Sequence, residues 1–225
     1  MQTMCIIVAL LLPSAITLGY FVLAADSASA WQQGTYTVGK MAQFLLPLVW
    51  VFGIQRRGRG DSPKHRTLSL WIGLAFGLVV AVVMVTAYHL WLRETPMMTR
   101  AADAVREKIS GFAINSTGRY LGLAVFYCCA HSLFEEYYWR WFVFGQLRDV
   151  IRYVPAIVIS SLGFMAHHVI VLGLFFGWDS PTTYLFSTSV AVGGAVWAWI
   201  YARSGSLIDP WLSHLILLSA GAGLI

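Results

Sequence analysis

Three ionisable side chains lie inside one of the most apolar stretches of the chain, HSLFEEYYWRWF at residues 131–142. Glu136 precedes Arg140 by four residues, which is the favoured order for an ion pair along a helix. His131 likewise precedes Glu135 by four residues on an adjoining face. If Arg140 neutralises Glu136, then Glu135 faces another part of the protein. A carboxylate in that position can accept a proton from water.

Two interpretations of this segment are open. A charge at the centre of a spanning helix costs about 2.5–3.5 kcal/mol on insertion scales, so three such groups need compensation. A buried ion pair that holds two helices in register would explain Glu136 and Arg140, but not Glu135. A functional site explains all three, because one carboxylate is held by the arginine while its neighbour acts as a base. We favour the functional interpretation.

Two later apolar segments also carry histidines. SSLGFMAHHVIVL places His167 and His168 midway along one segment, and DPWLSHLILLSAG places His214 about two turns into another. Phe164 lies one turn before His168, and Gly163 allows a neighbouring helix to approach closely. A single histidine in a membrane helix is most often a packing residue. Three segments that each bring acid, imidazole or guanidinium groups to comparable depth favour one shared site.

The order of these residues resembles the signature of the CAAX prenyl protease and bacteriocin-processing (CPBP, or Abi) family of intramembrane endopeptidases. In that family, Glu-Glu-x-x-x-Arg on one helix is followed by Phe-x-x-x-His on the next and by a histidine on a later helix. The resemblance covers residues 120–225. The matching residues of this chain are, in order, Glu135, Glu136, Arg140, Phe164, His168 and His214.

The resemblance and the residue chemistry together suggest peptide-bond hydrolysis without a covalent intermediate, on membrane-associated protein or peptide substrates. Glu135, aided by His168, would activate the attacking water. Glu136, paired with Arg140, would fix the local geometry. His214 would stabilise the oxyanion or protonate the leaving amine. The roles of the two glutamates could be reversed.

We expect no cofactor and no metal. Members of this family are often described as metalloproteases, and two histidines with a glutamate would make an acceptable zinc site. However, the chain contains no His-Glu-x-x-His motif, and a glutamate with a histidine can activate water without a metal.

The chain departs from the family pattern at the last motif. That motif usually reads His-x-x-x-Asn, and the amide helps to hold the developing oxyanion. Here Leu218 stands at the asparagine position, and Ser219 is the nearest small polar residue. Loss of one oxyanion donor commonly costs about 10²–10³ in rate. We therefore expect that Ser219 or a backbone N–H substitutes, or that the enzyme is slow or specialised.

Two other classes of function remain open. A non-catalytic membrane protein, such as a bacteriocin-immunity factor, could use the buried polar groups for specificity, and the missing asparagine favours this class. A proton-coupled transporter also uses intramembrane Glu, Arg and His residues. Carriers commonly contain repeated halves, and this sequence shows no internal repeat.

The composition predicts an all-α, polytopic helical bundle in contact with membrane lipid. Of the 225 residues, 58% are hydrophobic and 11% are charged, against about a quarter charged in soluble domains. The net charge of +5 gathers in loops, without the basic stripe and exposed aromatic residues that nucleic-acid binding needs. We therefore expect no nucleic-acid partner.

Apolar runs long enough to cross about 30 Å of hydrocarbon predict seven transmembrane helices. Residues 1–119 would form the N-terminal helices with a basic loop and a connector, and residues 120–225 the protease-like core of a single membrane domain. The predicted spans are residues 5–24, 35–54, 68–92, 120–147, 153–177, 182–202 and 207–225.

The first span could instead be a signal peptide, because Ala28-Ser29-Ala30 resembles a cleavage site. The residues before it include no Lys or Arg, and its apolar run is longer than the usual ~7–15 residues of a signal core. We favour a retained helix.

Basic residues predict the orientation. The loop QRRGRGDSPKHR at residues 55–66 should stay cytoplasmic. Two predicted spans precede it, so the N-terminus should lie on the same, cytoplasmic side of what we expect to be a bacterial inner membrane. Arg148, Arg152 and Arg203 then fall on the same side, and Asp179 on the other.

The connector at residues 93–119 would be external. It is either a plain connector or an amphipathic helix along the membrane interface. The apolar residues at helical spacing within it are Ala102, Val105, Ile109 and Phe112.

Overall fold

The structure is a computed structural model that describes residues 1–25, 29–56, 67–111 and 116–223; at residues 29 and 107–111 only the backbone is described. No β-strand occurs in these ranges. The α-helices are α1 (Gln2–Leu18), α2 (Ser29–Leu48), α3 (Thr67–Ala87), α4 (Pro96–Gly111), α5 (Thr117–Val125), α6 (Ser132–Glu136), α7 (Gly145–Val150), α8 (Tyr153–Phe176), α9 (Pro181–Ser204) and α10 (Ile208–Ala222). The prediction of an all-α membrane bundle is confirmed.

Several helices continue without a break into π-helical segments. The segments Gly19–Leu23, Val49–Ile54 and Tyr88–Leu92 extend α1, α2 and α3. Two more, Phe126–His131 and Tyr137–Phe144, join α5, α6 and α7 into one helical run from Thr117 to Val150. We call this run the site helix. π-helical turns are rare and are frequently found at functional sites.

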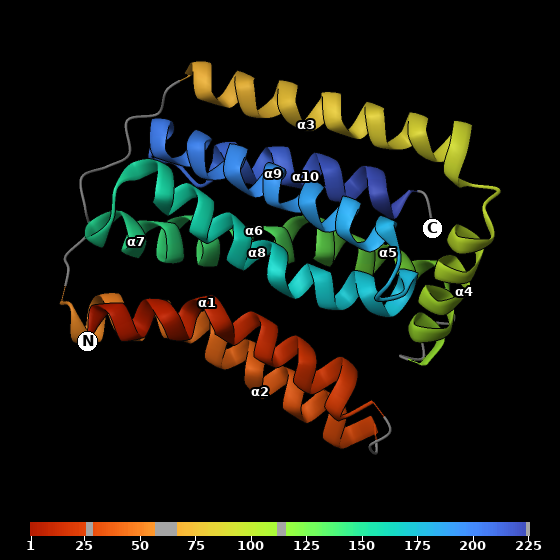
Figure 1. Cartoon of the computed structure of the whole chain (residues 1–225), viewed down its shortest axis with the longest axis horizontal. Coiled ribbons are helices and arrows are strands. Elements are labelled where there is room, and N and C mark those ends of the chain that lie inside the picture. Colours follow the sequence, from red (N-terminus) through yellow and green to blue (C-terminus); the bar gives the residue numbers. More distant parts are fainter. Residues whose placement is uncertain (26–28, 57–66, 112–115, 224–225) are drawn as a thin grey trace.

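The long helices run side by side in alternating directions (Figure 1). α1 and α2 form one edge of the molecule, and α3 forms the opposite edge. The site helix, α8, α9 and α10 lie between these edges, and the chain termini lie at opposite ends. α1 and α2 diverge from the other helices toward the end opposite the N-terminus.

Five helices are long and apolar enough to cross a membrane. They are Gln2–Leu23, Ala30–Ile54, Thr67–Leu92, Tyr153–Phe176 and Pro181–Ser204. The other two predicted spans correspond to the site helix and to α10. The site helix carries Glu135, Glu136 and Arg140 near its centre, and α10 has 15 residues, which reach only about 22 Å at 1.5 Å per residue. The count of seven therefore stays a prediction.

Three arginines gather at one end of the bundle. Arg148 and Arg152 flank the turn between the site helix and α8, and Arg203 lies at the end of α9 on the same side. Asp179 lies in the turn between α8 and α9, at the opposite end. The predicted grouping of these charges is confirmed. Of the basic loop at residues 55–66, all but its first two residues lie outside the described ranges.

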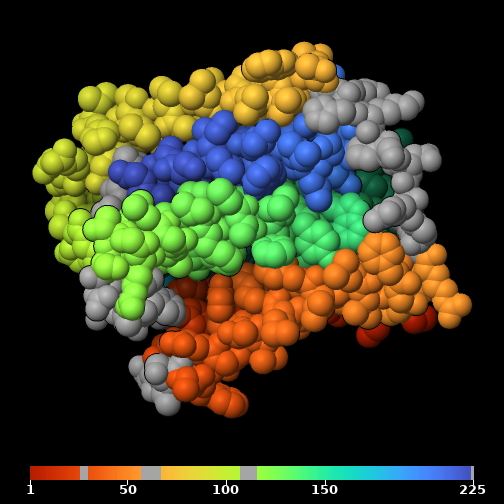
Figure 2. All heavy atoms as spheres, turned by 180° about the vertical axis from the view of Figure 1, so that it is seen from behind, coloured from red at the N-terminus to blue at the C-terminus, as the bar shows by residue number. Residues whose placement is uncertain are grey.

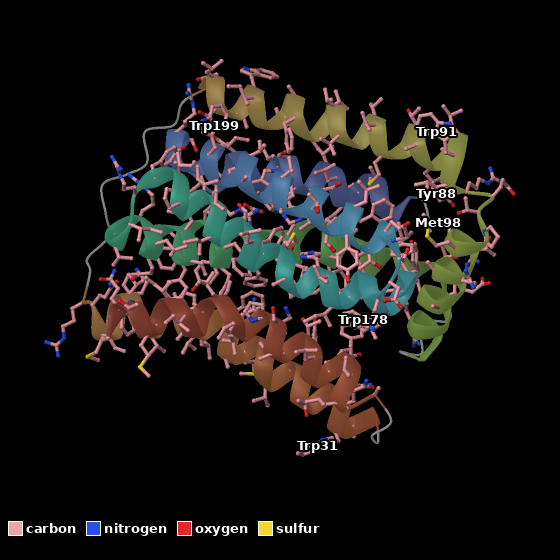
Figure 3. The ribbon with its side chains drawn as sticks, in the orientation of Figure 1. Trp31, Tyr88, Trp91, Met98, Trp178 and Trp199 are labelled. Atoms are coloured by element: carbon pink, nitrogen blue, oxygen red, sulfur yellow. The ribbon has the colours of Figure 1, made fainter. Side chains whose placement is uncertain are left out.

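Tryptophan side chains gather at both ends, as expected for the two membrane interfaces. Figure 3 shows Trp31, Trp91 and Trp178 toward the end opposite the N-terminus, and Trp199 at the other end. Trp31 and Trp91 are 69% and 73% exposed. Large apolar side chains are also exposed along α1, α2 and α3, so these helices present a surface suited to lipid.

Residues 96–111 form a helix, α4, which lies across the end of the bundle, roughly perpendicular to its neighbours (Figure 1). A plain connector is therefore wrong for this part of the chain. Ala101 is buried, and Ala102 and Val105 are partly buried. The side chains of Ile109 and Phe112 lie outside those described, and a location along the interface stays a prediction.

The core is formed by aromatic side chains of the site helix. Tyr138, Trp139 and Phe142 are almost completely buried, and the Tyr138 hydroxyl donates to the Ala9 carbonyl of α1 at 2.7 Å. A Cβ at Gly163 of α8 would lie 2.9 Å from the Trp139 ring, so this glycine allows the close approach that we predicted. The packing fixes the rotation of the site helix and directs its charged face toward α8, α9 and α10.

Candidate active site

Glu136 is fully buried and has two partners. Its Oε2 lies 3.1 Å from Nε of Arg140, one helical turn further along. Its Oε1 accepts a hydrogen bond of 2.9 Å from Nδ1 of His214 on α10. The predicted ion pair between Glu136 and Arg140 is thus present, and it extends across a helix interface. A carboxylate with both oxygens engaged is well suited to a positioning role.

The Arg140 guanidinium is packed between aromatic rings. Its Cζ lies 4.6 Å from the ring centroid of Phe164 and 5.1 Å from that of Trp197, which are distances of favourable cation–π contact. Nη1 and Nη2 have no hydrogen-bond partner among the described residues. Glu136 and the two rings are therefore the groups that stabilise this buried cation.

Trp197 also fixes His214. The two rings stack with centroids 4.2 Å apart and an interplanar angle of 22°, and Nε1 of Trp197 donates to the Ser213 hydroxyl at 3.1 Å. Since Nδ1 of His214 donates to Glu136, only its Nε2 is left for chemistry. That nitrogen lies 3.7 Å from Oε2 of Glu135.

Glu135 is surrounded by imidazole rings rather than by a permanent cation. Its Oε1 lies 3.4 Å from Nε2 of His131 and 3.9 Å from Nε2 of His167, and its Oε2 faces His214. The carboxylate is 7% exposed. The two glutamates therefore differ in their contacts: Glu136 has one hydrogen bond and one close ion pair, whereas Glu135 has only longer contacts with histidines.

His168 is oriented by the backbone of its own helix. Its Nδ1 donates to the Phe164 carbonyl at 2.9 Å, so Nε2 is the nitrogen without a proton in the neutral ring. The His167 and His168 rings lie with centroids 4.2 Å apart. In the Phe-x-x-x-His motif, the histidine side chain therefore donates to the carbonyl of the residue four positions earlier. This hydrogen bond selects the tautomer of His168.

One group of side chains could hold a metal ion. Potential ligand atoms of Glu135, His167 and His168 all lie within 4.8 Å of one another. Zinc–nitrogen bonds of about 2.0–2.1 Å would need the ligand atoms to be about 3.4 Å apart, which small side-chain rotations supply. These three residues fit a zinc ion, which would polarise a carbonyl oxygen and a bound water.

The structure brings together all five residues predicted for the site: Glu135, Glu136, Arg140, His168 and His214. His131 and His167 lie beside Glu135 as well, although neither was included in that set. The i to i+4 spacing of His131 and Glu135 was the available signal for the first. For His167, the available signal was its position next to His168, but either of two adjacent residues on a helix can face a neighbouring helix.

The position of the missing asparagine is occupied by an apolar side chain. Leu218 is partly buried and Ser219 is exposed on α10. Residues four and five positions after His214 lie on different faces of a helix, and Ser219 does not share the buried face. A substitute oxyanion donor, from Ser219 or from a backbone N–H, stays a prediction.

Comparison with known proteins finds a similarity in the C-terminal part of the chain. Residues 117–218 match the family model for Type II CAAX prenyl endopeptidase Rce1-like proteins. The match begins at the start of the site helix and ends within α10, so it contains every residue of the candidate active site and covers a little under half of the chain. No curated protein matches the chain, and no solved structure matches it. Residues 117–218 are therefore similar to Rce1-like CAAX prenyl endopeptidases.

Proposed function

We propose that the protein is an intramembrane endopeptidase that cuts membrane-associated proteins or peptides with a water molecule activated by Glu135. The observation that carries this proposal is the contrast between two adjacent buried carboxylates. Glu136 is bound by Arg140 and His214, whereas Glu135 faces three histidines at 3.4–3.9 Å. The family match supports the same class of reaction.

In the proposed mechanism, water binds between Glu135 and the unprotonated Nε2 of His168. Glu135 removes one proton as the water oxygen attacks the carbonyl carbon of the substrate, in the manner of a general base. No bond forms between enzyme and substrate. The attacking oxygen becomes part of the new carboxyl group.

The proton then reaches the leaving amine through His214. Nε2 of His214 lies 3.7 Å from Oε2 of Glu135 and is free to accept a proton, because Nδ1 carries the hydrogen donated to Glu136. Passing that proton to the peptide nitrogen allows the C–N bond to break. Glu136, Arg140 and Trp197 keep His214 in place for this transfer and do not react.

We propose that the reaction needs no metal, with Glu135 and His168 together activating the water. If zinc binds, then Glu135, His167 and His168 are the residues that would hold it. We further propose that the protein lies in a bacterial inner membrane with its N-terminus in the cytoplasm, and that residues 120–225 form the catalytic part.

A comparison of peptides released by cells tests the function and identifies the substrate. Cells carrying the native chain and cells carrying Glu135→Gln would be compared by mass spectrometry, with Glu94→Gln, an exposed residue, as the control. We expect peptides that are present with the native chain and with Glu94→Gln but absent with Glu135→Gln. A carrier would instead lose ion coupling in Glu135→Gln, and a non-catalytic interaction protein would keep its phenotype.

A further inference from the structure

A lysine from outside the matched segment lies beside the candidate active site. Lys40 is on α2, well inside the membrane span Ala30–Ile54. Its ammonium group donates to Oε1 of Gln43 at 3.1 Å and lies 5.7 Å and 5.6 Å from the ring centroids of Tyr36 and Phe44. A cation at this depth is costly. The catalytic scheme above gives it no role.

The charge of Lys40 is only partly compensated. An ammonium group has three N–H donors, and Gln43 accepts one of them. The contacts of the Glu135 oxygens are with histidines. Among the described residues, no carboxylate forms an ion pair with Lys40. An anion from outside the chain would complete the site.

Polar aromatic side chains lie beside both Lys40 and His131. The Tyr36 ring is the one beside Lys40 on α2, and Tyr127 belongs to the site helix. The Tyr127 ring lies 4.9 Å from the His131 ring, measured between centroids, and His131 contacts Glu135. We call Tyr36, Lys40, Tyr127 and His131 the Lys40 row.

The Lys40 row is reachable from outside, unlike Glu136. Tyr127 is 41% exposed, and Tyr36, Lys40 and His131 are partly exposed. Figure 2 shows α2 and the site helix side by side on one face of the molecule, with their surfaces separating toward the end opposite the N-terminus. Lys40 and Tyr127 are therefore more accessible than Glu135, which is 7% exposed.

We infer that Lys40 binds a carboxylate of the peptide substrate and so selects which peptide bond is placed at Glu135. This inference rests on the proposed function. Carboxylates are the anions that peptides carry, at the C-terminus and on Asp and Glu side chains, and the Tyr36 and Tyr127 hydroxyls can add neutral hydrogen bonds. An extended chain covers about 3.3–3.6 Å per residue, so the carboxylate would lie within a few residues of the bond that is cut.

A different role for Lys40 would be to act as a distant counter-ion for Glu135. The two roles predict different kinetics. A counter-ion affects the reaction of every substrate equally, because it acts on the base. A binding residue affects only substrates that carry the carboxylate, and leaves cleavage of uncharged substrates unchanged.

The test uses the full chain in phosphatidylcholine vesicles and a library of acylated peptides made in matched pairs. One set compares a free C-terminal acid with the C-terminal amide, and the other compares an internal Glu with Gln. The enzymes would be the native chain, Lys40→Gln, Lys40→Glu and, as a control for loss of a basic residue, Arg100→Gln on the exposed face of α4. Mass spectrometry would give kcat/KM for each peptide.

We expect the native chain and Arg100→Gln to favour one carboxylate-bearing set by about tenfold to a hundredfold, the usual effect of a hydrogen bond to a charged group. The set that shows the preference identifies the source of the carboxylate. Lys40→Gln should lose the preference while retaining its rate on the uncharged partners. Lys40→Glu should reverse the preference and favour the uncharged member of each pair.

Equal loss of activity on both members of each pair in Lys40→Gln would assign Lys40 to the counter-ion role and overturn the inference. The native chain alone also provides a test, which does not depend on the folding of any variant. If it cuts both members of each pair at the same rate, the inference is overturned while the proposed function stands. If the native chain cuts no peptide beyond the background of Glu135→Gln, the proposed function fails and the inference fails with it.

Discussion

Arg140 and Glu136 are stable in the interior because each contacts groups that compensate its charge. The guanidinium has one carboxylate and two aromatic faces, and the carboxylate has one guanidinium and one imidazole N–H. Burial of a charge without such partners costs several kcal/mol. The same contacts that stabilise the pair also fix the ring of His214, so stability and positioning depend on the same atoms.

Arg140→Met should leave the Glu136 carboxylate buried beside an apolar side chain. We expect it to lower the free energy of unfolding by about 3–5 kcal/mol and to abolish cleavage. The double variant Arg140→Met with Glu136→Gln removes both charges and should recover part of the stability but no activity. Unfolding in detergent, followed as a melting temperature, measures the first effect, and peptide cleavage measures the second.

Arg93→Met is the matched control. Arg93 forms an ion pair of 3.3 Å with Glu94, but both side chains are exposed, and such pairs contribute only about 0–1 kcal/mol. Equal melting temperatures for Arg140→Met and Arg93→Met would contradict the role assigned to the buried pair.

The choice between metal-free and zinc-dependent chemistry concerns the histidines around Glu135. Because we assign water activation to Glu135 and His168, cleavage by the purified protein should survive incubation with a strong zinc chelator. The measurement is the initial rate before and after chelation, with a known zinc protease treated in parallel. Loss of activity that returns on addition of zinc would assign Glu135, His167 and His168 to a metal site.

At the scale of the elements, the position of His214 depends on how closely α10 packs against α3. A Cβ at Gly77 would lie 2.8 Å from the Ser213 carbonyl oxygen, and one at Gly73 would lie 2.8 Å from that of Asp209. These two glycines on α3 therefore allow backbone contact along α10. The helix that lies outside the family match thus sets the location of a residue within it.

Gly77→Ala should push α10 away from α3 and move His214. We expect a loss of about 1–3 kcal/mol in stability, typical of overpacking, together with slower cleavage. Gly122→Ala on α5 is the matched control, because a Cβ there would meet no atom within 4 Å. It should leave activity intact and raise the free energy of unfolding by up to about 1 kcal/mol, since alanine has a higher helix propensity than glycine. Melting temperatures and cleavage rates of the two variants provide the comparison, and an unaffected Gly77→Ala would show that α3 does not position the site.

The sequence predicted helices and active-site side chains wherever the pattern lay within one short segment of the chain. Hydrophobic run length predicted the long helices, and i to i+4 spacing predicted the pairing of Glu136 with Arg140. It did not show which of His167 and His168 approaches Glu135, because both positions face neighbours on a helix buried on several sides. It also missed Trp197, whose contacts with Arg140 and His214 arise from the packing of α9 against the site helix and α10.

At the scale of the whole molecule, the arginines at the N-terminal end of the bundle predict its orientation. Arg148, Arg152 and Arg203 lie at the end where the N-terminus begins, and Asp179 lies at the other. Basic residues near the ends of membrane helices favour the cytoplasmic side. Lys40, in the first half of the span Ala30–Ile54, would then lie in the external half of the membrane.

Labelling of single cysteines tests this orientation. In a chain with Cys5, Cys128 and Cys129 replaced by serine, Asp179→Cys and Arg152→Cys each introduce an exposed thiol. A membrane-impermeant maleimide should label Asp179→Cys in intact cells and Arg152→Cys only after the membrane is opened. The reverse pattern would place the N-terminus outside and contradict the assignment.

The central claim is that Glu135, assisted by His168 and His214 from two other helices, activates the water that cuts a peptide bond. The most direct test is the cleavage rate of a reconstituted native chain against Glu135→Gln, using a peptide identified by the cell comparison and with equal melting temperatures confirming that both are folded. The account predicts a fall of at least about 10³-fold, since a buried amide cannot take the proton from water. A Glu135→Gln protein that is folded and still cuts the peptide at the native rate would contradict it.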